Sequence, residues 1–213
     1  MVALGAAVAL AGCASHKVAT PGEAKLENED LAAVTADLRA AAPQVEAEVA
    51  AAKAAWPAIL AGVRGRPTAS TRAKVAIAAE RAAQVPLPSL LGEEGSAQLT
   101  GPAFSLAGQF RSFRTLGARS WQLLDSSLEE IDHGSPAEAR FARRNLPLYI
   151  ESIYDAHFAL GGLGKKLSDA FKKLGGEGKI GGSLSPAELQ RLAETYSQER
   201  NDLSPKERVK LGS

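Results

Sequence analysis

Side chains able to do chemistry gather around a histidine on an apolar helical stripe in the C-terminal half of the chain. His157 falls between Ile153 and Leu160, at the spacing of three and four residues that marks one helix face. A buried imidazole needs a partner for at least one ring nitrogen, which a carboxylate, a hydroxyl or a ligand can supply. Two interpretations stay open: a core histidine bonded to a neighbouring side chain, or one wall of an interior ligand site.

Three polar residues close to His157 in the sequence complete this candidate ligand-binding group. They are Glu151, Tyr154 and Asp155. Successive helical residues are turned by about 100°, so Glu151 and Asp155 point well away from His157. The four side chains therefore cannot enter one site from one helix. We assign no catalytic residue.

A weaker candidate for metal binding lies in the segment before this group. Glu130 and His133 have the Glu-x-x-His spacing that places a carboxylate and an imidazole on one helix face in ferritin-like bundles. Those bundles need two such motifs and two further glutamates, whereas this sequence offers one. A histidine at a helix end is also favoured by the helix dipole alone. We expect no metal and no other cofactor.

The start of the chain carries an uncharged apolar run followed directly by a cysteine. Residues 2–12 are too few to span a bilayer but match the hydrophobic core of a secretory signal. The stretch Leu10-Ala11-Gly12-Cys13 resembles the lipobox of bacterial lipoproteins. That resemblance implies cleavage before Cys13 and acylation of its thiol. The alternative is a buried helix in which Cys13 is a small core residue.

The resemblance also implies a location. The protein is expected to be exported and anchored by its acyl chains to the cell membrane or the outer membrane, with its domain outside the cytoplasm. Ala14 occupies the position where an Asp retains members of this family at the inner membrane, which favours the outer membrane. No Lys or Arg precedes the apolar run, so we expect the basic segment of the leader to lie upstream.

The net charge and the amino-acid composition limit which partners and which reactions are possible. The 25 Lys and Arg residues nearly balance the 24 Asp and Glu residues, giving a net charge of +1 that argues against a nucleic-acid partner. Once Cys13 is acylated, no thiol remains for disulfides, thiolate metal sites or nucleophilic catalysis. The expected partners are the membrane, through the lipid, and an envelope protein.

Apolar periodicity predicts five helices and no strand. The first stripe covers residues 29–63, where Pro43 and Pro57 predict a kink or a break near Pro43. Further helices are expected over 71–84, from just after Thr100-Gly101-Pro102 to His133, over 135–174, and over 185–199. Ser135 and Glu138 form a capping box at the start of the fourth. The leucines of the loop 86–92 are expected to cover part of the core.

These helices predict an all-α fold, a four- to five-helix bundle with a kinked first helix and a short C-terminal helix packed on it. The expected divisions are a signal peptide, a lipidated tether, the bundle, a glycine-rich linker, and a C-terminal helix with its tail. Their residues are, in that order, 1–12, 13–28, 29–174, 175–184 and 185–213.

Two groups of basic residues on the fourth helix have two interpretations. One group contains Arg140, Arg143 and Arg144, and the other Lys165, Lys166, Lys172 and Lys173. They form either a solvated helix face or a contact with anionic headgroups.

The leading functional hypothesis is a non-catalytic, lipid-anchored bundle that acts through protein or surface contacts. The alternative is a bundle that binds a small ligand or metal near His157, and an enzyme is the third.

Overall fold

The computed structural model describes residues 21–63, 67–173 and 186–197. All regular structure in these ranges is helical, so the predicted all-α bundle is confirmed. The elements are α1 (Pro21–Val63), α2 (Ala69–Gln84), η1 (Ser89–Leu91), α3 (Glu93–Ser96), α4 (Gly101–His133), α5 (Pro136–Lys173) and α6 (Pro186–Thr195). None of the helices built from the described residues has an apolar stretch of the length that crossing a bilayer requires.

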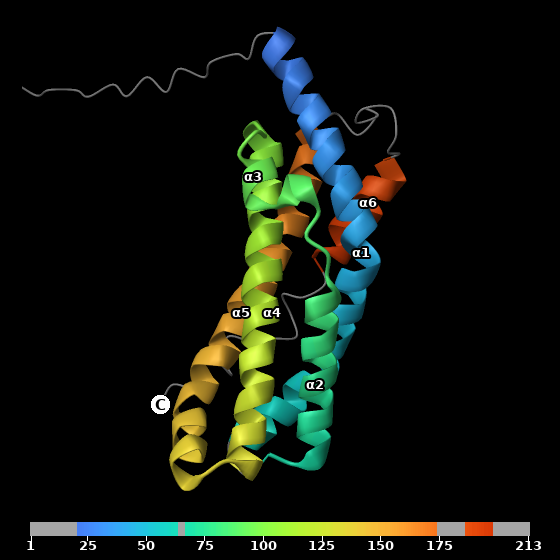
Figure 1. The fold of residues 1–213 in the computed structure, drawn as a ribbon. Helices are drawn as coiled ribbons and strands as arrows, with labels where there is room; N and C mark the ends of the chain where they lie inside the picture. Colours follow the sequence, from blue (N-terminus) through green and yellow to red (C-terminus); the bar gives the residue numbers. More distant parts are fainter. Residues whose placement is uncertain (1–20, 64–66, 174–185, 198–213) are drawn as a thin grey trace, which may run out of the picture.

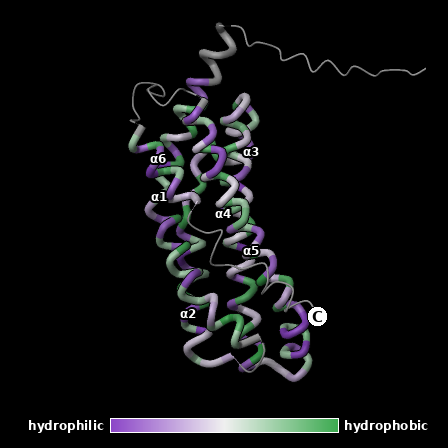
Figure 2. The backbone as a smooth tube through the Cα atoms, turned by 180° about the vertical axis from the view of Figure 1, so that it is seen from behind, coloured by the Kyte–Doolittle hydropathy of each residue, from purple (hydrophilic) through white to green (hydrophobic). Residues whose placement is uncertain are grey.

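The helices form an elongated bundle in which α4 and α5 run side by side in opposite directions (Figure 1). α1 and α2 form a second antiparallel pair that packs on α4. α2 reaches only part of the way up the bundle, and η1, α3 and α6 pack around the other half (Figure 1). Hydrophobic and hydrophilic residues alternate along the long helices, as amphipathic helices require (Figure 2).

Two hydrophobic clusters divide the interior. The upper core, named for its place in Figure 1, joins α1, α4, α5 and α6 through residues such as Leu38, Phe110, Leu160 and Tyr196. The lower core joins α1, α2, α4 and α5 through residues such as Trp56, Val75, Trp121 and Ile153. The short helix α6 therefore belongs to the upper core, as the predicted packing of a C-terminal helix requires.

α1 differs from its prediction at two places. It begins at Pro21, so residues 21–28, predicted as part of the tether, are helical. Proline is well tolerated in a first helical turn, and the strong helix formers that follow it extend the helix. The helix also continues through Pro43 and Pro57, so no break occurs near Pro43. Both prolines are exposed, while buried residues on either side pack into the two cores and offset their cost of about 3 kcal/mol each.

The predicted ends of α4 and α5 are confirmed within about two residues. The capping box at the start of α5 also forms: Ser135 N donates to Glu138 Oε2 at 2.7 Å, and Glu138 N donates to Ser135 Oγ at 3.3 Å. These bonds lower the pKa of the Glu138 carboxyl. Between α2 and α4, Leu91 is buried as expected and Leu90 packs partly against the upper core, but Leu87 is 44% exposed. The short helices η1 and α3 were not predicted.

Two glycines on the interior side of their helices give a matched test of packing. A β-carbon at Gly164 would lie 2.7 Å from the backbone nitrogen of Ser197, just after α6, whereas one at Gly117 would lie 3.5 Å from Ala156 Cβ. We expect Gly164→Ala to lower the free energy of unfolding by about 1–3 kcal/mol and to loosen α6, because backbone must move. Gly117→Ala should be neutral or stabilise by up to about 1 kcal/mol, because alanine favours helix.

Chemical denaturation gives the two free energies, and amide hydrogen exchange in α6 locates the change. The expectation is wrong if both substitutions have the same effect, or if exchange in α6 is unaltered by Gly164→Ala.

Candidate functional site in the bundle interior

A carboxylate, an indole and an imidazole from three helices meet in the interior. Trp121 Nε1 donates to Glu48 Oε1 at 3.0 Å, and His157 Nε2 lies 3.1 Å from the same oxygen. An ionised Glu48 can only accept, and Nε2 would then carry the proton of the second bond. The side chains of Glu48, Trp121 and His157 are between 0% and 2% exposed. We call these three residues the polar cluster.

The helices that supply the polar cluster place it between the two cores. Glu48 lies on the buried side of α1 beside Val49, which belongs to the upper core, and one turn before Ala52, which belongs to the lower core. Trp121 comes from α4 and His157 from α5. The ring of Phe113 meets the imidazole edge to face, with centroids 5.8 Å apart and planes at 84°. Apolar packing thus encloses the polar cluster above and below.

The hydrogen bonds of Glu48 are unevenly divided between its two oxygens. Oε1 takes both bonds, while Oε2 is buried and has no hydrogen-bond partner within the described part of the chain. Taking a carboxylate out of water is costly, and hydrogen bonds to the charged form offset that cost. Glu48 accordingly ties α1 to both α4 and α5. Among the described residues, Trp121 and His157 are the hydrogen-bond partners of its side chain.

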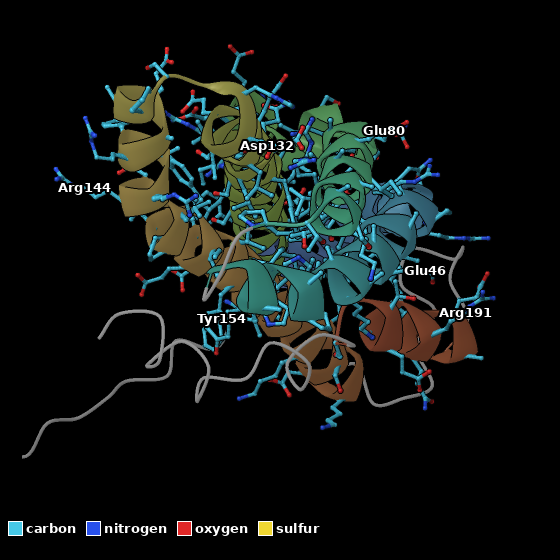
Figure 3. The ribbon with its side chains drawn as sticks, turned by 90° about the horizontal axis from the view of Figure 1, so that it is seen from below. Glu46, Glu80, Asp132, Arg144, Tyr154 and Arg191 are labelled. Carbon is cyan, nitrogen blue, oxygen red and sulfur yellow. The ribbon has the colours of Figure 1, made fainter. Side chains whose placement is uncertain are left out.

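The structure separates His157 from the other predicted members of its group. Glu151 and Asp155 are exposed, as the helical wheel predicts. Tyr154 is partly buried against the lower core and lies toward the edge of the bundle in Figure 3. Whether any of these four residues binds a ligand stays a prediction, but they do not form one cluster.

The metal candidates near the end of α4 also lie apart from the interior. Glu130 and His133 are both exposed, and His133 Nε2 is 3.4 Å from Asp132. Among the described residues, no three histidine, cysteine, aspartate or glutamate side chains gather as metal ligands would. The lipidation candidate Cys13 and the glycine-rich linker lie outside the described residues.

Sequence reasoning missed Glu48 and Trp121 as partners of His157. A signal for Glu48 was present, because it lies among Val45, Val49 and Ala52 on the apolar stripe of α1, where a carboxylate is out of place. Trp121 was assigned to its helix stripe only as a large apolar residue. A buried indole N–H usually finds an acceptor, and the carboxylate on the facing helix is that acceptor.

A hollow of about 220 Å³ lies on the outside of the bundle between α1 and α6. Glu46 and Arg191, which help to line it, lie on the same side of the molecule in Figure 3. Its polar groups bond to one another: Arg39 pairs with Glu188 at 3.3 Å, and Thr195 Oγ1 donates to Glu46 Oε1 at 2.9 Å. These contacts hold α6 against α1.

Comparison with protein-family models, with curated proteins and with solved structures finds no match to this chain.

Proposed function

We propose that this chain is a lipid-anchored helical protein of the bacterial cell envelope that acts through its surface, without catalysis. The observation that carries the proposal is the leader: an apolar run over residues 2–12 stands directly before the only cysteine of the chain. The resemblance of Leu10-Ala11-Gly12-Cys13 to a lipobox supplies export and acylation. Several acyl chains on one residue hold a protein stably at a bilayer, whereas a single chain holds it only marginally.

The interior supports the non-catalytic part of this proposal. Glu48 and His157 are the pair best suited to acid–base chemistry, yet they bond to each other and are at most 2% exposed. A substrate from solvent could reach them only if the helices moved apart. The residues that face solvent are left to make the functional contacts.

Export and acylation are tested by comparing Cys13→Ser with the wild-type chain. The wild-type protein should fractionate with membranes, and its intact mass should show loss of the leader and gain of acyl chains. Cys13→Ser should lose the acyl mass and leave the membrane fraction, whereas the neighbouring control Ser15→Ala should behave as wild type. An unmodified Cys13 in a soluble product that retains its leader would contradict the proposal.

A second candidate function is favoured by one observation, the buried Oε2 of Glu48 that has no hydrogen-bond partner in the described ranges. A small polar ligand or a metal beside His157 would give that oxygen a partner. Elemental analysis and an absorption spectrum of the purified protein test this candidate, together with the same measurements on His157→Leu. Absence of metal and chromophore from the wild-type protein would count against it.

A further inference from the structure

The first half of α5 presents large apolar side chains to solvent. Phe141 is 65% exposed and Leu148 is 58% exposed. They are seven residues apart, which places them on one side of the helix, two turns from each other. The opposite side of the same segment is buried through Ala142, Leu146 and Ile150. The exposed Phe141 and Leu148 are therefore apolar residues outside the buried side by which α5 packs into the bundle.

Two arginines lie on the same side of α5 as these apolar side chains. Arg140 and Arg144 are within about 100° of Phe141 and Leu148 around the helix, whereas Arg143 is turned about 200° from Phe141. Arg140, Arg143 and Arg144 are all exposed, and none of them makes an ion pair within the described part of the chain. Arg144 points outward from the bundle in Figure 3. No Asp or Glu occurs from residue 139 to residue 150. We call Arg140, Phe141, Arg144 and Leu148 the arginine–phenylalanine face.

Two of the nearby acidic side chains are engaged elsewhere, whereas the exposed Glu151 lies one turn beyond Leu148 on the same side of α5. Asp132 is bonded to Arg72 at 2.6 Å, on the α2 side of the bundle. Glu138 bonds to the backbone of its own helix cap. Glu129 and Glu130 are exposed on the adjacent helix α4.

We infer that the arginine–phenylalanine face binds the surface of a bilayer that contains anionic phospholipid. Guanidinium groups pair with lipid phosphates, and isolated apolar side chains on a convex helix enter the headgroup region without needing a matching pocket. A protein partner would have to supply such a pocket for each of Phe141 and Leu148. The inference deepens the proposed function and rests on it, because the acylated Cys13 would bring this face to a membrane.

The position of the arginine–phenylalanine face determines how the bundle would be oriented on the membrane. It is at the end of the bundle opposite the start of α1 (Figure 1). A helix of the 43 residues of α1 is about 65 Å long. Contact of this face with the bilayer that holds Cys13 would therefore lay the bundle along the membrane.

The test is sedimentation of the full chain, carrying Cys13→Ser, with vesicles of phosphatidylcholine with and without phosphatidylglycerol. We expect binding that needs phosphatidylglycerol and weakens as salt is added, because salt screens exposed charges. Replacing Arg140 and Arg144 together by Gln should weaken binding by about 30-fold, at about 1 kcal/mol for each arginine. Phe141→Ser with Leu148→Ser should weaken it by on the order of tenfold or more.

Matched controls come from the same chain. Lys74 on α2 and Arg191 on α6 are exposed away from the face, and their joint replacement by Gln removes the same charge. Ile77 and Phe104 are each 51% exposed away from the face, and replacing both by Ser removes comparable apolar surface. Both control variants should bind vesicles nearly as the parent chain does. Circular dichroism of each variant checks that it is folded.

Several results would overturn the inference. These are absence of binding to phosphatidylglycerol, equal losses in the control variants, and capture of an acidic protein by this face without vesicle binding. Binding to pure phosphatidylcholine would point to the apolar leader instead. Because the parent chain here has no acyl group, failure of this test leaves the fractionation test of Cys13 unaffected.

Discussion

Replacing Glu48 with leucine is expected to lower the free energy of unfolding by about 2–6 kcal/mol, because it leaves two buried donors without an acceptor, at about 1–3 kcal/mol each. Glu48 Oε1 is the shared acceptor for Trp121 Nε1 and His157 Nε2. Leucine removes that acceptor, while both donors stay in a region that is at most 2% exposed. A buried polar group that loses its hydrogen bond keeps its full cost of desolvation. Chemical denaturation measures the change.

A double-mutant cycle separates the pair from the effect of either residue alone. Glu48→Leu with His157→Leu should recover part of the loss, because His157 no longer leaves a buried donor unpaired, while Trp121 Nε1 still lacks its acceptor. Thr35→Val is the control, since Thr35 is buried on α1 but donates only to the local Leu31 carbonyl at 2.6 Å. It should change stability by less than about 1.5 kcal/mol. A Glu48→Leu variant as stable as the wild type would show that the hydrogen bonds of Glu48 do not stabilise the bundle.

The sequence predicted the elements of this fold well because helix periodicity, caps and breakers are local. The stripe through Phe110, Phe113, Trp121 and Leu124 and the cap at Ser135 each depend on residues within a few turns. Local signals also explain the wrong start of α1 and the prediction of a break near Pro43 as an alternative to a kink. Proline propensity near Pro43 indicated an interruption, but burial on both sides of it is a tertiary contribution that propensity does not contain.

The polar cluster could be predicted only in part for a different reason. Periodicity placed His157 on a buried face and so predicted that it needs a partner. It did not say which residue of another helix lies at the same height, and Glu48 is 109 residues away in the sequence. The carboxylate on the stripe of α1 and the imidazole on the stripe of α5 were each visible as a polar residue in an apolar face. To predict that Glu48 and His157 meet, one must know the axial position of α1 relative to α5, and the packing of the helices determines that position.

The docking of α6 depends on one aromatic side chain, so Tyr196→Ala should cost about 3–5 kcal/mol. Tyr196, just past the end of α6, is 0% exposed, and its hydroxyl donates to the carbonyl of Leu38 on α1 at 2.6 Å. Its ring also meets Phe110 of α4 edge to face, with centroids 6.2 Å apart. Tyr196→Phe keeps the ring and should cost only about 0.5–1.5 kcal/mol for the lost hydrogen bond. Hydrogen exchange should show that α6 opens before the rest of the bundle in Tyr196→Ala.

Alkaline pH gives an independent measure of the same contact. Burial raises the pKa of Tyr196 above its ordinary value, and the nearby carboxylate of Glu46 raises it further. The folded protein therefore favours the neutral phenol. The resulting stability is complete below pH of about 10, where the unfolded chain begins to ionise, and is lost as the pH rises above it. Tyr196→Phe should remove this part of the alkaline loss, leaving stability less dependent on pH than in the wild type. Equal slopes of stability against pH in the two proteins would mean that Tyr196 is not held neutral against α1.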